Sequence, residues 1–167
     1  GVDMEKDYNN DQEDFNQMAA FYEMDLTKLD FKSIPDNYFD GIWMVHVIEH
    51  LYNGDEVIKL LLPKLKMGGY MYVEYPGKRS TTLPSMHGSL NFKDDPTHVR
   101  VYAVKELSAL FTANNCRVLS SGTRRNPWFM MAIPFRVVMS LVKGEKMQGN
   151  IFWDVLGFAE YLWVQKK

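Results

Sequence analysis

The chain has 167 residues, of which 46% are hydrophobic and 24% charged, with a formal net charge of -2. This composition is typical of one globular domain with a sizeable core, and the absence of a basic surplus argues against a nucleic-acid partner. The single cysteine, Cys116, excludes an internal disulfide framework and fits a reducing compartment. No apolar run reaches the ~20 residues of a membrane span and we recognise no signal peptide, so we expect a cytoplasmic protein.

The amino-terminal quarter predicts one short strand and little else. Residues 1–4 resemble the last turn of a buried strand, and residues 5–14 are rich in Asp, Asn and Glu, which is typical of an exposed loop or a frayed helix start. Residues 15–21 favour a short helix. Residues 21–26 alternate apolar and acidic side chains, which is the period of a strand.

The stretch 39–50 predicts the strand around which the chain is organised. An acidic residue opens it, a mostly apolar run follows, and a polar cluster ends it, as in strands buried on both faces of a parallel sheet. Ligands of open α/β sheets bind beyond the carboxyl ends of such strands. The polar cluster at 46–50 should therefore face a ligand.

Helices and strands alternate through the rest of the chain. A helix is expected from Asp55 to about Lys66, interrupted by Pro63 and ended by two glycines, followed by a strand at 70–75. Residues 76–98 form a loop long enough to suggest function. A helix at 103–114, a strand at 116–120, an apolar segment at 129–142 broken at Pro134, and a strand at 157–165 follow. The alternation predicts an α/β fold, a mostly parallel sheet with helices on both faces.

Several motifs resemble one known family. They are G-V-D at 1–3, M-D-L at 24–26, F-D-G-I at 39–42, V-I-E-H-L at 47–51, L-P-K-L-K-M-G-G-Y at 62–70 and P-T-H-V-R-V-Y at 96–102. Each is weak alone, but their order and spacing resemble the S-adenosylmethionine-dependent methyltransferases of the Rossmann-like class, in the branch with the ubiquinone and menaquinone biosynthesis enzymes. The resemblance implies S-adenosylmethionine as cofactor and a sheet whose last strand is antiparallel.

One departure from the family concerns the amino terminus. The glycine-rich turn that holds the methionyl end of the cofactor in this family is not found, and the sheet would lack its first strand and most of its second. We therefore expect residues 1–167 to be the carboxyl portion of a single methyltransferase domain, with a long loop at 76–98 and an insertion at 124–150.

The resemblance also implies roles for particular residues. Asp3 would bind the ribose hydroxyls with Met4 against the adenine, and Asp25 and Leu26 would contact the adenine edge, while Met44, Val45 and His46 would line the methionyl part. His50 and His98 are the candidate catalytic bases, because histidine titrates near neutral pH. Arg100 and Tyr75 are candidate substrate contacts.

The expected activity is methyl transfer to a small-molecule acceptor, which the sequence does not identify. The apolar segment 128–142 favours a hydrophobic acceptor or a homodimer contact. Two alternatives remain: a degenerate, non-catalytic methyltransferase-like scaffold that binds a partner, and, remotely, a zinc hydrolase, because residues 46–50 read H-x-x-E-H. The zinc chemistry requires both histidines on one helical face, whereas the motif lies at a strand end, so no metal is expected.

Overall fold

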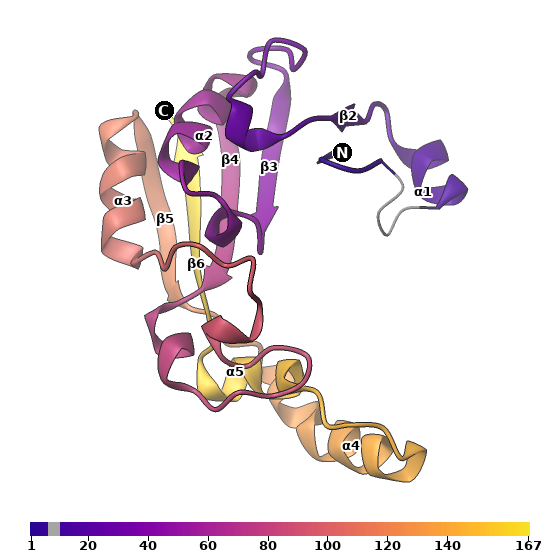
Figure 1. The fold of residues 1–167 in the computed structure, drawn as a ribbon. Helices are drawn as coiled ribbons and strands as arrows, with labels where there is room; N and C mark the ends of the chain where they lie inside the picture. Colours follow the sequence, from indigo (N-terminus) through magenta and orange to yellow (C-terminus); the bar gives the residue numbers. More distant parts are fainter. Residues whose placement is uncertain (7–10) are drawn as a thin grey trace.

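The computed structural model describes residues 1–6 and 11–167 of the chain. Its centre is a sheet with the spatial order β3-β4-β6-β5 (Figure 1). The strands are β3 (Phe39–Val45), β4 (Leu65–Pro76), β5 (Cys116–Thr123) and β6 (Ala159–Lys166). β3 and β4 are parallel, whereas β6 is antiparallel to both of its neighbours. Three strands therefore share one direction, which confirms the mostly parallel sheet with an antiparallel last strand.

A second, smaller sheet joins β1 (Val2–Asp3) and β2 (Tyr22–Glu23) in parallel. It does not pair with β3, and Figure 1 shows the two sheets apart. A cavity of about 420 Å³ lies between them, lined mainly by apolar side chains such as Val2, Ile42 and Met44. The strand expected over residues 21–26 is shorter than predicted: β2 ends at Glu23, and a 3-10 turn capped by Asp25 begins at Leu26.

The first helix, α1 (Gln12–Gln17), begins earlier than the expected 15–21 because Asp11 caps it. The Asp11 carboxylate accepts hydrogen bonds from the backbone N–H groups of Glu13 and Asp14, which are otherwise unpaired donors at a helix start. The loop expected over 5–14 includes residues 7–10, which lie outside the described residues.

Helices α2 (Gly54–Leu61) and α3 (Val104–Ala113) cover one face of the larger sheet. Their buried side chains Val57, Ile58, Leu107 and Phe111 form one core with inward side chains of β3, β4 and β6. The opposite face carries aromatic side chains that remain open to solvent in the described part of the chain. These are Trp43, Tyr70 and Trp163, with exposed fractions of 64%, 39% and 37%.

Pro63 ends α2 earlier than the sequence suggested. The helix stops at Leu61, a 3-10 turn spans Leu62–Lys64, and β4 starts at Leu65 rather than at residue 70. The buried Lys64 fixes this turn, since its ammonium donates to the carbonyl of Ile34 at 2.8 Å and pairs with Asp36 at 2.7 Å. Residues 55–66 therefore form most of a helix, a 3-10 turn and the start of a strand, and not the single helix expected.

Helix α4 (Pro127–Lys143) runs without a break through Pro134, whereas the sequence predicted an interruption there. Asn126 caps its start and Gly144, at φ 66°, ends it in the left-handed conformation that glycine tolerates best. The helix projects away from the body, beside the short helix α5 (Trp153–Leu156) (Figure 1). Among the described helices, none combines the length and apolarity needed to cross a membrane.

The long loop at 76–98 is closed on itself by Asp94. This carboxylate accepts hydrogen bonds from the Ser85 hydroxyl and from the backbone N–H groups of Met86, Leu90 and Asn91. Partial desolvation opposes ionisation of Asp94, but these donors outweigh it and lower its pKa to about 2. The loop is therefore an ordered support for the residues that follow it, Asp95 to His98.

Arg100 joins the two core helices. Its guanidinium pairs with Asp55 at the start of α2 and with Glu106 in the first turn of α3, and it lies 4.4 Å from the ring centre of Tyr102. We expect Arg100→Met to lower the free energy of unfolding by about 1–2 kcal/mol, through lost ion pairs and a lost cation–π contact. Urea unfolding measures this, with the exposed α3 residue Lys105→Met as control; equal stability of the two variants would contradict the clamp.

Candidate active site

The chain leaves β3 through a turn at His46. This residue has φ 52°, and its N–H donates to the carbonyl of Glu74 at 2.9 Å, so that the ladder between β3 and β4 ends there. A 3-10 turn over Ile48–His50 follows. The turn places the side chains of His46, Glu49 and His50 at the carboxyl edge of the parallel strands, where ligands of such sheets bind.

His46 lies between two carboxylates. Its Nδ1 is 3.1 Å from Oε1 of the fully buried Glu49, and its Nε2 is 3.4 Å from Oε1 of Glu74. Burial disfavours the charged imidazole, but the hydrogen bonds to Glu49 and Glu74 outweigh that cost and raise the pKa of His46 to about 9. His46 is therefore a cation at neutral pH, with no lone pair to accept a proton.

Glu74 continues this network toward β5 and α5. It accepts a hydrogen bond from the Tyr72 hydroxyl at 2.6 Å, and Arg124 links it to Asp154, with contacts of 3.4 Å and 2.9 Å. Burial alone would raise the pKa of Glu74, but His46, Tyr72 and Arg124 together lower it. The carboxylate is thus ionised and held by its partners, which fits a structural role.

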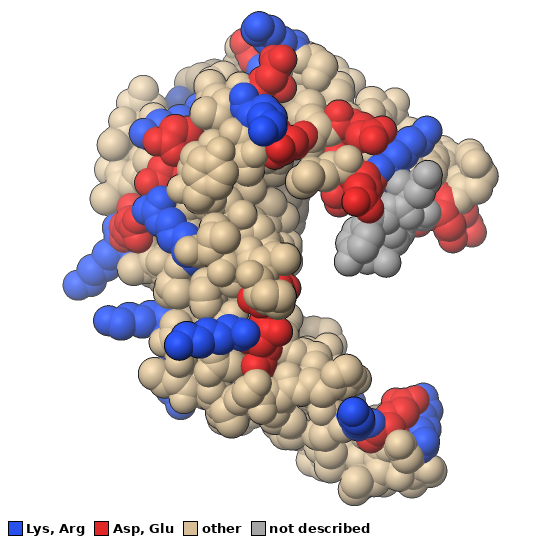
Figure 2. All heavy atoms as spheres, viewed as in Figure 1, with Lys and Arg blue, Asp and Glu red and all other residues tan. Residues whose placement is uncertain are grey.

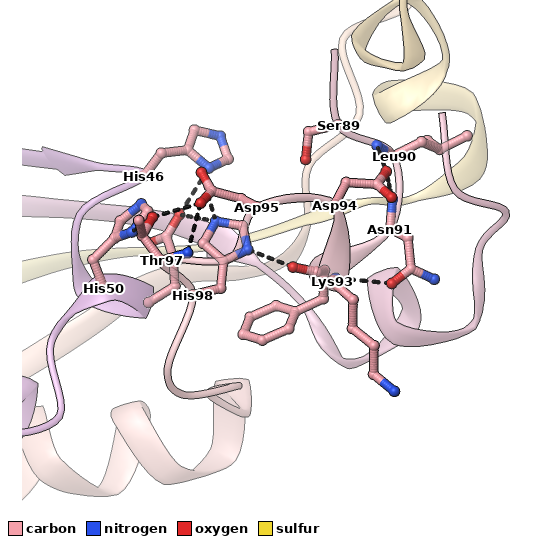
Figure 3. Close-up of polar contacts among 12 residues, drawn as sticks. His46, His50, Ser89, Leu90, Asn91, Lys93, Asp94, Asp95, Thr97 and His98 are labelled. Carbon is pink, nitrogen blue, oxygen red and sulfur yellow. Dashed lines mark hydrogen bonds and ion pairs between the residues drawn. The ribbon is translucent and has the colours of Figure 1, made fainter. Parts of the chain in front are cut away.

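His50 is oriented by a chain of two hydrogen bonds (Figure 3). The Thr97 hydroxyl is 2.5 Å from a carboxylate oxygen of Asp95 and 2.8 Å from Nδ1 of His50. The hydroxyl has one proton, which the carboxylate accepts, so the threonine oxygen accepts from Nδ1–H of His50. This assignment leaves the lone pair of His50 on Nε2, the nitrogen that could take a proton from a substrate.

His98 lies beside His50. Its Nδ1–H donates to the carbonyl of Phe92 at 2.7 Å, and its ring lies 4.7 Å from that of Phe92 and 4.8 Å from that of His50. Its side chain is only 6% exposed, and its Nε2 is 3.9 Å from Glu49 and from Asp95. The nearly buried His98 side chain is thus held by Phe92 and faces Glu49 and Asp95, and the catalytic role of either histidine stays a prediction.

Glu49, His50 and His98 could also hold a metal ion, because one ligand atom from each lies within 4.8 Å of the others. The H-x-x-E-H arrangement of a zinc peptidase is a different matter. It requires a helix that carries both histidines, whereas His46 has a left-handed backbone and the helical turn begins only at Ile48. The remote zinc-hydrolase alternative thus lacks its geometry.

The two predicted nucleoside-binding carboxylates lie near the same edge of the smaller sheet. Asp3 ends β1 and Asp25 follows β2, and the backbone of Met24 between them donates to the carbonyl of Asp3 at 2.8 Å. The Asp25 carboxylate accepts from the N–H and hydroxyl of Thr27, and these bonds lower its pKa. Asn53, which precedes α2, donates to the carbonyl of Thr27 at 2.9 Å and ties this turn to the start of α2.

The remaining predicted cofactor residues are divided among four places. Leu26 and Met44 line the cavity between the two sheets. Met4 is 63% exposed and follows Asp3, whose carboxylate its N–H contacts at 2.6 Å. Val45 is exposed at the end of β3, on the side opposite to Met44. His46 lies within the carboxylate network rather than on the cavity wall.

The two predicted substrate contacts lie outside this cluster. Arg100 is occupied by Asp55 and Glu106, and Tyr75 is fully buried against Tyr102, with ring centres 6.1 Å apart. Burial raises the pKa of the Tyr75 hydroxyl. Both side chains therefore have partners in the packing of the sheet against its helices, while the Arg100 backbone N–H donates to the carbonyl of Glu49 at 3.2 Å. Their roles as substrate contacts stay predictions.

Four polar partners in this network were not among the predicted site residues: Glu74, Asp95, Thr97 and Arg124. Glu74 had a signal, since an acidic residue inside an apolar strand is seldom buried without a partner. Glu49 pairs with His46 across the turn. Nothing in the sequence marked Thr97 or Asp95 in this way, because only the fold brings residue 97 beside residue 50.

Solved structures share this fold. A SAM-dependent methyltransferase from Archaeoglobus fulgidus aligns with a TM-score of 0.61 and 22% identity, over 100% of this chain and 75% of that one. A putative S-adenosylmethionine-dependent methyltransferase from Listeria monocytogenes aligns with a TM-score of 0.61 and 10% identity, over 100% of this chain and 79% of that one. An S-adenosylmethionine-dependent methyltransferase from Mesorhizobium loti aligns with a TM-score of 0.59 and 10% identity, over 87% of this chain and 68% of that one. No curated protein matches significantly.

The sequence profile of the methyltransferase domain family matches residues 1–121. That range contains β1 to β4, most of β5 and every residue of the His46–His98 cluster. It confirms the resemblance to the Rossmann-like, S-adenosylmethionine-dependent class and S-adenosylmethionine as the family's cofactor. The chain therefore belongs to the methyltransferase domain family.

Proposed function

We propose that this domain transfers a methyl group from S-adenosylmethionine to a small-molecule acceptor, with His50 taking the proton that the acceptor loses. The observation that carries the proposal is the Asp95–Thr97–His50 chain, which fixes the imidazole with its Nε2 lone pair free. Bound S-adenosylmethionine supplies a methyl group activated by the neighbouring sulfonium charge. The protein's task is to align the acceptor and to remove its proton.

The acceptor groups near the smaller sheet fit the nucleoside half of this cofactor. A ribose offers two vicinal hydroxyls to a carboxylate, and an adenine amino group needs an acceptor, which supports the proposed roles of Asp3 and Asp25. The apolar cavity lined by Leu26 and Met44, about 420 Å³ in volume, adds a surface suited to an aromatic base. The proposal places the nucleoside across the ends of β1, β2 and β3.

Asp25→Asn tests the cofactor part of the proposal. Asparagine keeps the cap at Thr27 but removes the charge, so we expect little change in stability and about a tenfold weaker Kd for S-adenosylhomocysteine. Isothermal titration calorimetry measures the Kd. Asp30→Asn is the matched control, because Asp30 is an exposed carboxylate that also accepts from a backbone N–H two residues on.

A non-catalytic scaffold is the competing function. It predicts no heat of binding for S-adenosylmethionine or S-adenosylhomocysteine. Saturable binding that Asp25→Asn weakens and Asp30→Asn does not would reject the scaffold. Equal Kd values in all three proteins would remove Asp25 from the site.

A further inference from the structure

Helix α4 presents a continuous apolar stripe to solvent. Its large outward side chains recur at intervals of three and four residues, which places them on one face of the helix. They are Trp128, Met131, Phe135, Val138 and Val142, with exposed fractions of 78%, 72%, 68%, 55% and 76%. Soluble proteins seldom expose such a contiguous apolar face without a partner for it.

Contacts with α5 hold the start of α4 in place. Asp154 of α5 accepts from the backbone N–H of Asn126, the residue that caps α4, at 2.8 Å. Arg125 donates to the carbonyls of Asp154 and Val155. The opposite side of α4 contains the buried Ser140. Figures 1 and 2 show α4 as an arm that leaves the body, with a mostly uncharged surface in this view.

The charges of α4 are all of one sign. Its 17 residues include Arg136 and Lys143 and no acidic residue, and Lys146 follows just beyond its end. In the described part of the chain, no acidic side chain pairs with these three cations. The only acid in this stretch is Glu145, next to Lys146. The arm thus combines an apolar stripe with unneutralised positive charge.

This charge distribution favours one occupant of the stripe. Arg136 lies about 100° around the helix from Phe135, so a second copy packed stripe to stripe would leave it outside the contact. That copy would bring the same cations and no acidic residue on α4, so it offers no counter-charge. An anionic lipid surface, in contrast, neutralises the cations while its acyl region accepts the apolar stripe.

We propose that α4 docks on an anionic membrane surface, lying in the plane of the interface with the stripe from Trp128 to Val142 in the acyl boundary. The helix is about 25 Å long. Because the stripe runs along one face over this length, the helix would lie along the surface. Arg124, immediately before the helix, contacts both Glu74 and Asp154. Docking would therefore bring the carboxyl edge of the sheet close to the lipid and give an apolar acceptor a short path to it.

Vesicle co-sedimentation of the full chain tests the docking. We expect binding to vesicles of phosphatidylcholine with phosphatidylserine, weaker binding to phosphatidylcholine alone, and a loss of the difference at high salt. Met131→Glu should reduce the association constant by about tenfold or more. Met67→Glu is the matched control, because Met67 is 68% exposed on β4 and should leave binding unchanged. Arg136→Gln should weaken binding to the anionic vesicles alone, by about fivefold.

Three results would overturn the proposal: no sedimentation of the wild-type chain with anionic vesicles, an equal loss in Met67→Glu, or a lipid-free dimer that Met131→Glu dissociates. The docking does not rest on the proposed function. Binding of S-adenosylhomocysteine by Met131→Glu, measured in parallel, separates the two, because a docking failure leaves that Kd unchanged.

Discussion

Replacing His50 by alanine is expected to lower kcat for methyl transfer by about 10²–10³-fold, the usual contribution of a positioned general base. The Kd of S-adenosylhomocysteine should change little, because the imidazole acts on the acceptor. Thr97→Val should have a smaller effect of the same kind, about tenfold in kcat, since it removes the hydroxyl that fixes the tautomer of His50.

The measurement is transfer of radiolabelled methyl to the acceptor that the wild-type chain methylates fastest in a panel of phenols, thiols and amines. His87→Ala is the matched control, because His87 is an exposed histidine of the 76–98 loop. A wild-type chain that methylates none of the panel contradicts the proposed function. An unchanged kcat in His50→Ala leaves methyl transfer standing and removes His50 as its base.

Glu49→Gln is expected to lower the free energy of unfolding by about 2–3 kcal/mol, because it leaves the buried His46 cation with one carboxylate instead of two. The loss should depend on pH with a defined sign. The pKa of His46 is raised from 6.5 to about 9 by folding, so its contribution is fully present below pH 6.5 and disappears as the pH rises toward 9. That contribution is up to about 3 kcal/mol in the wild-type chain.

Urea unfolding at a series of pH values between 6 and 9 tests this expectation. The wild-type chain should lose stability across the window, and Glu49→Gln should begin less stable and lose less. Glu145→Gln, an exposed carboxylate beyond α4, serves as the control and should follow the wild-type curve. Parallel curves for wild type and Glu49→Gln would show that Glu49 does not hold the charge of His46.

Helix and strand positions followed from the sequence where the pattern was local. The expected helix at 103–114 differs from α3 by one residue at each end, because its apolar face repeats regularly and the strand after it is clear. Proline was less informative. Pro63 lies in the 3-10 turn that ends α2, where the sequence predicted only an interruption, whereas Pro134 lies inside the continuous helix α4. Since proline removes only one helical hydrogen bond, its surroundings decide whether the helix continues.

The residues of the candidate site could likewise be predicted only in part. His50 and His98 could be singled out because their residue type and position after a strand or loop are visible in the sequence. Arg100 and Tyr75 looked equally suitable, yet the fold places one in an ion-pair clamp and the other in the core. The sequence contains no information on which polar group meets which across 45 or more intervening residues, as Thr97 meets His50.

By itself the sequence determined the family and the α/β class, because these depend on short motifs and on local periodicity, and it predicted an edge of the sheet for the chemistry. Only the tertiary structure decided what each histidine contacts. His46 lies between Glu49 and Glu74 and is a cation, while His50 faces Thr97 and keeps a free nitrogen. Charge state depends on burial and on the nearest partners in space, and those are properties of the folded chain.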